Sequence, residues 1–241
     1  MRLFCLPYFA GGASVFNTWH EYLPEEIEVC AIQYPGREER RGEEPFDNYL
    51  DLVKAISDVI DPLLNCPIAF YCHSAGAGIG LELARYLRRE KGIQPVKFIV
   101  GAWRSPHLVS PFKFLDAIED DEVYMDKNIP NIIQHLKSLE IPDSVLQNRE
   151  LIEEMLPALR ADILLGKRYT YYEDDPLNCS LTALVGNEDT VFSEEQVKQW
   201  KKHTAGEFRF MKVKGSHLFC RDNKEELLEL LTEELAEFAN V

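Results

Sequence analysis

Three polar residues that together perform nucleophilic acyl chemistry in many enzymes each follow a short apolar run of the sequence. Ser74 follows the run IAFYCH, Asp189 lies shortly after LTALV, and His217 lies shortly after FRFMKV. A serine hydroxyl becomes a nucleophile when a histidine takes its proton and a carboxylate orients that histidine. The chain order Ser, Asp, His is that of the α/β-hydrolases. We therefore expect Ser74, Asp189 and His217 to form a catalytic triad.

The segment around Ser74 is similar to a nucleophile elbow, G-x-S-x-G, in which the serine sits on a sharp turn between a strand and a helix. Here the segment reads CHSAG, so Cys72 replaces the first glycine of the pattern. A serine at such a junction can instead be the N-cap of the helix. The motif alone leaves both interpretations open.

The proposed base and acid also have alternatives. His217 is the best placed of the six histidines, because it lies on the loop between the last predicted strand and the last predicted helix. His73 adjoins Ser74 in the sequence and would point another way on a tight turn. Glu188 is a local alternative to Asp189 as the acid. A further alternative is that this loop is a Gly-Asn turn without catalytic function.

Acyl transfer also needs backbone N–H groups that stabilise an oxyanion. Ala75, the residue after the nucleophile, is expected to supply one of them. The other is expected from the loop PYFAGGAS after the first apolar run, because its glycines let the backbone approach a substrate closely. We expect Ala10 to be this second donor, with Phe9 as the alternative. The alternative is that this loop is a flexible turn that takes no part in catalysis.

The elements that must position these residues are short apolar runs that alternate with segments of helical periodicity. This alternation predicts an α/β fold with a mainly parallel, twisted sheet and helices on both faces. The predicted strands are 3–6, 27–33, 68–72, 96–103, 181–185 and 208–213, and the predicted helices are 47–64, 75–90, 194–203 and 224–239.

The stretch 105–175 interrupts this alternation. It contains helical patterns at 112–120, 130–139 and 149–165, separated by prolines, and no convincing strand. Long insertions in α/β sheets often cover the carboxyl ends of the strands, where ligands bind. We expect a single domain over 1–241 with a helical lid at 105–175, and a purely structural subdomain is the alternative.

Composition and charge exclude several classes of function. The 241 residues carry 26 Lys and Arg against 41 Asp and Glu, a net charge of −15, which disfavours nucleic-acid binding. The six cysteines are scattered without a CxxC pair, as in proteins of the reducing cytosol. The opening MRLFCLPYF lacks the features of a signal peptide, and no apolar run approaches the ~20 residues of a membrane span. We therefore expect a cytoplasmic protein without membrane contact, and nothing in the sequence requires more than a monomer.

Several segments resemble the type II thioesterases that accompany nonribosomal peptide and polyketide synthases. They are LFCLPYFAGGAS, IQYPGREER, CHSAG, GAWRSPHL, LPALRADILLGKRYTYY, GNEDTV and GSHLF, which together extend over most of the chain. The Pro-Gly-Arg segment at 32–40 is the most specific match. The sequence departs from the family at Cys72, at Ser216 in place of the second glycine of Gly-Gly-His, and between Pro7 and Ala-Gly-Gly, where two residues replace the usual one.

The resemblance implies an α/β-hydrolase that removes acyl groups from the phosphopantetheine arm of acyl and peptidyl carrier domains. Such enzymes edit nonribosomal peptide and polyketide biosynthesis, including that of antibiotics. The resemblance implies the same triad, Ser74, Asp189 and His217, and no metal or organic cofactor. A small-molecule carboxylesterase or acyltransferase with this triad is the alternative, and an inactive module that docks on a synthetase is a third possibility.

Positive residues near the Pro-Gly-Arg segment are candidates for contact with an acidic carrier or with the phosphate of its arm. They are Arg37, Arg40 and Arg41, accompanied by a second basic group on the predicted helix 75–90. Because glutamates are interleaved with these arginines, the alternative to carrier binding is a solvated charged face without a binding function. His107, at the start of the expected lid, is a further candidate for contact with substrate.

Overall fold

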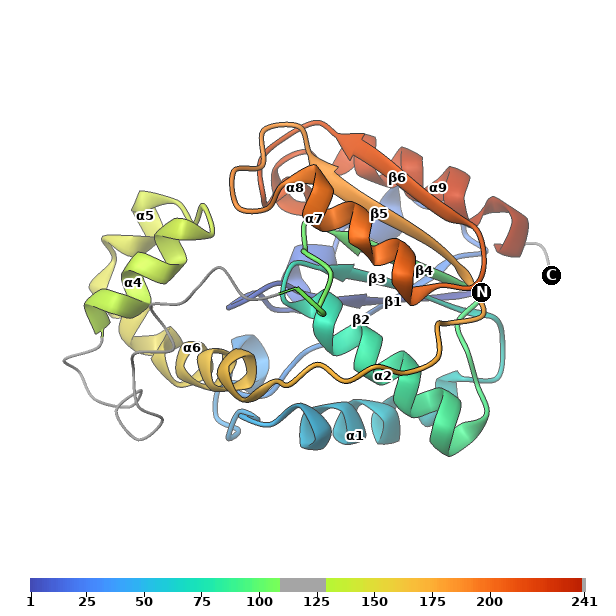
Figure 1. The fold of residues 1–241 in the computed structure, drawn as a ribbon. Coiled ribbons are helices and arrows are strands. Elements are labelled where there is room, and N and C mark those ends of the chain that lie inside the picture. Colours follow the sequence, from blue (N-terminus) through green and yellow to red (C-terminus); the bar gives the residue numbers. More distant parts are fainter. Residues whose placement is uncertain (109–128, 240–241) are drawn as a thin grey trace.

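Six parallel strands form a sheet in the order β2-β1-β3-β4-β5-β6 (Figure 1). This computed structural model describes residues 1–108 and 129–239. All six predicted strands are present, although the second and the fourth are shorter than predicted. Their bounds are β1 Arg2–Leu6, β2 Glu28–Ala31, β3 Ile68–His73, β4 Lys97–Gly101, β5 Ser180–Gly186 and β6 Phe208–Val213.

The burial of the strands follows their place in the sheet. Every residue of β3 (IAFYCH) is buried, because helices cover both faces of a central parallel strand. The edge strand β6 (FRFMKV) has only exposed and partly buried positions before Val213. The continuous apolar run before Ser74 is therefore the signature of a strand buried on both faces.

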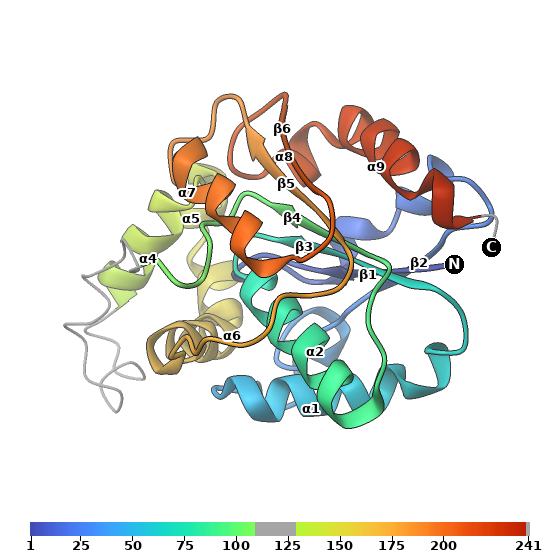
Figure 2. The same cartoon turned by 45° about the vertical axis from the view of Figure 1, so that its right-hand side comes forward.

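Helices cover both faces of the sheet (Figure 2). Apolar residues of α1, α2 and α7 pack on one face, and those of α8 and α9 pack on the other together with two short 3-10 helices at 13–16 and 19–21. No described helix is long and apolar enough to cross a membrane. The helices are α1 Tyr49–Ile60, α2 Gly76–Lys91, α7 Glu194–Lys198, α8 Phe219–Asp222 and α9 Lys224–Ala239.

The topology brings distant loops together at the carboxyl edge of the sheet. The chain starts in the interior at β1, moves out to β2 and returns to β3 on the other side of β1. Because Leu6 is paired with Cys72, the loops that follow β1 and β3 leave the sheet side by side. Gly186 is paired with Val213, so the loops after β5 and β6 are also neighbours. Ligand sites of open parallel sheets form at such edges.

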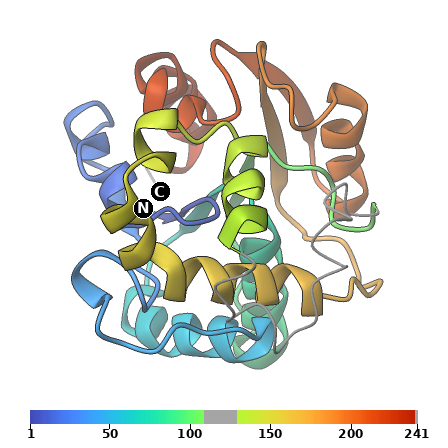
Figure 3. The ribbon, with the colours of Figure 1, turned by 90° about the vertical axis from the view of Figure 1, so that its left-hand side faces the viewer.

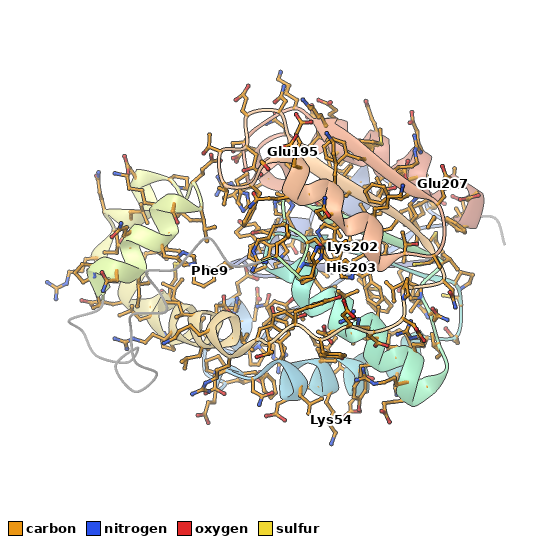
Figure 4. The ribbon with its side chains drawn as sticks, in the orientation of Figure 1. Phe9, Lys54, Glu195, Lys202, His203 and Glu207 are labelled. Atoms are coloured by element: carbon orange, nitrogen blue, oxygen red, sulfur yellow. The ribbon has the colours of Figure 1, made fainter. Side chains whose placement is uncertain are left out.

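Three helices between β4 and β5 in the chain form the described part of the predicted lid: α4 Ile129–Ser138, α5 Asp143–Leu146 and α6 Arg149–Arg168. The sequence predicted α4 and α6 but not the short α5, and the pattern at 112–120 lies outside the described residues. Figure 3, seen from the lid side, shows these helices in front of the sheet. Their apolar residues form a separate cluster around Phe9, at the carboxyl edge of the sheet (Figure 4).

Candidate active site

The elbow at the end of β3 has the strained geometry expected of a nucleophile turn. Ser74 has a φ of +50°, in the left-handed region, and its N–H donates to the Gly101 carbonyl at 2.7 Å. At Gly76 a Cβ would lie 2.5 Å from the Pro7 carbonyl oxygen, so only glycine lets α2 pass this close to β1. The Ser74 side chain makes no capping bond to α2, which disfavours the N-cap interpretation.

Cys72 fits into the elbow because a glycine of the helix faces it. A Cβ on Gly80 of α2 would lie only 2.3 Å from the Cys72 sulfur. In the usual pattern, a glycine at the position of Cys72 leaves room between strand and helix. Here Gly80 of α2 leaves the room that the Cys72 side chain occupies. The departure at Cys72 therefore does not distort the turn that presents Ser74.

The three predicted triad side chains meet. Ser74 Oγ lies 2.9 Å from His217 Nε2, and His217 Nδ1 lies 3.1 Å from Asp189 Oδ2. The Asp189 carboxylate only accepts hydrogen bonds, so Nδ1 carries the ring proton and Nε2 accepts from the Ser74 hydroxyl. The other Asp189 oxygen accepts from the Val191 N–H at 2.8 Å. Glu188, the alternative acid, has an exposed side chain.

The buried His73 side chain contacts the backbone of His217. Its Nε2 donates to the His217 carbonyl at 2.8 Å, so its Nδ1 accepts from the Tyr71 hydroxyl, also at 2.8 Å. Burial, reinforced by nearby His217, lowers the pKa of His73 to about 3 and keeps the ring neutral. His73 therefore holds the His217 backbone and is not a base for Ser74, as its position in the sequence suggested.

The amide that we expected to be the second oxyanion donor is hydrogen-bonded elsewhere. Ala10 has a φ of +63°, and its N–H donates to Asp162 Oδ2 at 2.9 Å. Ala10 is therefore the wrong choice for the second oxyanion donor, because its amide is already engaged. The alternative, Phe9, donates its N–H to no described residue, and both Phe9 and Ala75 line the cavity at this end of the sheet.

The Pro-Gly-Arg segment braces this loop. The Gln33 side-chain oxygen accepts from the Ala13 N–H at 2.8 Å, and Glu38 accepts from the Ser14 N–H at 3.1 Å. Arg37 donates to the Gly11 carbonyl at 3.1 Å. A Cβ on Gly12 would lie 2.2 Å from the carboxyl carbon of Glu38, so a side chain there would displace this carboxylate from the loop.

Arg37 is not a surface residue, and its assignment to carrier binding is wrong in this structure. Its side chain is only 8% exposed, and its two terminal nitrogens lie 2.8 and 3.1 Å from the carboxylate oxygens of Asp162. Arg40 and Arg41 do reach the surface, with side chains 40% and 69% exposed. Arg40 is paired with Glu43 at 2.5 Å.

The other cations that we considered have local partners. Arg88 of α2 lies 2.9 Å from Asp174, and Arg85 lies 2.9 Å from Glu82. His107 shares a hydrogen bond of 2.9 Å with Ser105 Oγ, and burial and nearby cations lower its pKa. These contacts explain the basic residues of α2 as structural ion pairs.

A cavity of about 110 Å³ lies between the elbow, the loop after β1 and the lid helices. Phe9 and Ala75 line it on the side of the elbow, and Trp103, Leu165 and Tyr169 contribute to its mainly apolar wall. An apolar cavity of this kind suits the hydrocarbon part of an acyl group.

Comparison with known proteins identifies the family. A model of the thioesterase domain matches residues 1–235, nearly the whole chain. The chain belongs to the thioesterase family. The resemblance drawn from its motifs and the predicted α/β-hydrolase fold are both confirmed, and the enzyme is a hydrolase.

Several relatives cover nearly the whole thioesterase chain. The gramicidin S biosynthesis protein GrsT of Aneurinibacillus migulanus is 37% identical over 236 residues, which are 98% of this chain and 89% of the relative. The structure of RedJ, a thioesterase of the prodiginine pathway of Streptomyces coelicolor, is 30% identical with a TM-score of 0.84, and the match covers 97% and 85% of the two chains. BorB, a type II thioesterase of the borrelidin cluster, is 27% identical with a TM-score of 0.81 over 97% and 92%.

Two acidic residues of the lid were missed as parts of the site. Asp162 contacts the loop after β1, and Glu140 contacts the loop of His217. Asp162 lies in LRAD, a segment that already resembled the family, so the motif was a usable signal for it. Glu140 lies in a turn between lid helices, and no motif marks it.

Proposed function

We propose that this thioesterase hydrolyses acyl groups from the phosphopantetheine arm of carrier domains and so edits nonribosomal peptide or polyketide biosynthesis. The observation that carries the proposal is the short path from Ser74 Oγ through His217 to Asp189 beneath the lid. The biosynthetic relatives named above support a carrier-bound substrate.

In the proposed reaction, His217 Nε2 takes the Ser74 proton as Ser74 Oγ attacks the thioester carbonyl. The tetrahedral intermediate collapses to an acyl-serine ester, and the pantetheine thiolate departs with the proton from His217 Nε2, so that the thiol is released and His217 is neutral again. His217 then takes a proton from water, the hydroxide attacks the ester, and the proton returns to Ser74 as the carboxylic acid departs. A thiolate is a good leaving group, so the first step needs little acid catalysis.

The backbone N–H groups of Phe9 and Ala75 would stabilise the oxyanion of both intermediates. Loss of one such donor costs about 3 kcal/mol in the transition state. The braces from Gln33, Arg37 and Glu38 therefore matter for rate as well as for stability, because they fix the loop that carries Phe9.

The pantetheine arm would enter between the lid and the Pro-Gly-Arg segment. Arg41 lies at this boundary, 3.8 Å from Glu154 of α6, and Arg40 is its exposed neighbour. Arg41 can exchange its exposed partner for an acidic carrier surface or the phosphate of the arm. Arg40 is held more firmly, by both Glu43 oxygens and the Gln33 carbonyl, and would contribute its positive charge from that position.

The test compares an acyl-loaded carrier with a p-nitrophenyl ester of the same acyl group. The proposal predicts a higher kcat/KM for the carrier substrate. A preference for the ester would instead identify a small-molecule carboxylesterase. Failure of a fluorophosphonate to label Ser74 in the folded protein would show that the site is inactive.

A further inference from the structure

The lid segment is hydrogen-bonded to both halves of the proposed catalytic machinery. Asp162 of α6 contacts the loop after β1, which carries the proposed oxyanion donor. Glu140, in the turn after α4, contacts the loop that carries His217. Each contact is made by a carboxylate to a backbone N–H, a hydrogen bond roughly twice as strong as one between neutral groups.

Asp162 is held in a buried cluster. One of its oxygens accepts from the Ala10 N–H at 2.9 Å, and both oxygens accept from Arg37 in a bidentate pair. The Asp162 side chain is only 10% exposed. Arg37 also donates to the Gly11 carbonyl at 3.1 Å, so the pair holds the loop on both sides of the Ala10–Gly11 peptide unit.

The backbone of Ala10 explains why the loop needs this grip. Ala10 has a φ of +63°, a conformation that costs an alanine about 1 kcal/mol and persists only where its surroundings impose it. The bond to Asp162 is such a constraint, and it acts one residue after the Phe9 N–H, which donates to none of the described residues. Release of Ala10 would let the adjoining Phe9 peptide change its orientation.

Glu140 contacts the other half of the proposed catalytic machinery, the loops that carry His217 and Asp189. Its Oε2 accepts from the His217 N–H at 2.7 Å, and its Oε1 accepts from the Thr190 hydroxyl at 2.7 Å. Thr190 follows Asp189, so a single carboxylate joins the loops of the triad base and the triad acid. Glu140 also has a positive φ, +60°, in the turn that aims it at this site.

We propose that Asp162 and Glu140 are positioning residues: Asp162 sets the oxyanion amide of Phe9 through Ala10, and Glu140 sets His217 against Ser74 through the His217 backbone. The lid is then part of the catalytic apparatus as well as a cover for the cavity. This inference rests on the proposed Ser74 chemistry, but not on the identity of the acyl carrier.

The first experiment measures Asp162→Asn and Asp162→Ala with a small acyl thioester. The Asn variant keeps one acceptor oxygen for Ala10 and loses the fork to Arg37. We expect kcat to fall about 10-fold for Asn and about 100-fold for Ala, toward the loss of a whole oxyanion donor, with KM within about twofold. Affinity for a trifluoromethyl ketone analogue, which forms a tetrahedral adduct on Ser74, should fall by the same factors as kcat/KM.

The second experiment measures Glu140→Gln and Glu140→Ala. Gln retains an oxygen that accepts from the His217 N–H, so we expect a loss of kcat of only a few-fold, against about 10-fold or more for Ala, since small displacements of a reacting group reduce rates strongly. The rate at which a fluorophosphonate labels Ser74 should fall in parallel. Glu153→Gln is the matched control, because Glu153 is an exposed residue of α6 whose partner among the described residues is Arg149, and it should leave each quantity unchanged.

If Asp162 and Glu140 only stabilised the fold, their variants would show another pattern of effects. The Asp162 and Glu140 variants would then lose thermal stability but keep wild-type kcat and labelling rate below their unfolding temperature, and that result would overturn the proposal. If Asp162→Ala does not fold, Arg37→Lys tests the same cluster, with the expected loss of kcat accompanied by faster amide hydrogen exchange at Ala10. Wild-type labelling at Ser74 without hydrolysis of an acyl-carrier would count against the proposed function alone, because the labelling comparison needs no carrier.

Discussion

Replacement of Gly80 by alanine is expected to disturb the elbow, and replacement of Cys72 by glycine is expected to relieve that effect. A methyl group on Gly80 would lie 2.3 Å from the Cys72 sulfur and 3.3 Å from its Cβ, with Phe98 at 3.4 Å on another side. Cys72 and Phe98 are both fully buried, so the overlap cannot be relieved toward solvent.

The expected magnitude follows from two opposing effects. Alanine is favoured over glycine inside a helix by about 1 kcal/mol. Overpacking of a filled core costs about 1–3 kcal/mol, so Gly80→Ala alone should lower the free energy of unfolding by up to about 2 kcal/mol. In the Cys72→Gly background the overlap is absent and the helix preference remains, so the same change should stabilise the protein by about 1 kcal/mol.

Urea unfolding of the wild type, both single variants and the double variant gives the coupling energy. We expect about 1–3 kcal/mol, together with a lower kcat for Gly80→Ala that the double variant partly restores. Effects that add within about 0.5 kcal/mol would refute the reasoning, because residues in contact should couple.

Three further predictions concern the surroundings of the triad. Tyr71→Phe removes the hydroxyl that donates to His73, and we expect kcat to fall several-fold with little change in KM; an unchanged kcat would mean that His73 does not need this partner. The pKa of buried His73 and the pKa of buried His203 are both lowered to about 3, so below about pH 6.5 the unfolded chain binds protons that the folded chain does not. The free energy of unfolding should therefore decrease as the pH is lowered through this range, by about 1 kcal/mol per pH unit per histidine. His203→Gln should make this dependence on pH, measured by urea titration, less steep. Charge reversal at Arg40 and Arg41 should raise KM for an acyl-carrier but not for a small thioester, and equal effects on both substrates would exclude these arginines from carrier docking.

The sequence was sufficient to predict the sheet and the meeting of the Ser74, Asp189 and His217 side chains because of the way a parallel sheet is built. Ser74, Asp189 and His217 each follow a strand, and loops after parallel strands converge at one edge. The choice between Asp189 and Glu188 needed coordinates, because both follow β5 within a residue of each other. The two peptides around Phe9 and Ala10 were equally ambiguous, since an N–H direction depends on a turn conformation that Asp162 imposes from 152 residues away.

Contacts between distant elements were beyond the reach of local patterns. Arg37 was predicted to contact the carrier because it belongs to a local group of positive residues, but α6 buries it against Asp162. Cys72 seemed to weaken the elbow motif until Gly80 was seen to face it. In both cases the missing information was which residue of another helix lies opposite.

The central claim is that Ser74 takes the acyl group from a carrier thioester. Intact-protein mass spectrometry of an acyl-loaded carrier measures this directly, with wild-type enzyme and with Ser74→Ala side by side. The account predicts that the wild type returns the carrier to its free-thiol mass over many turnovers, while Ser74→Ala leaves it loaded at the rate of spontaneous hydrolysis. Unloading by folded Ser74→Ala at the wild-type rate would contradict it.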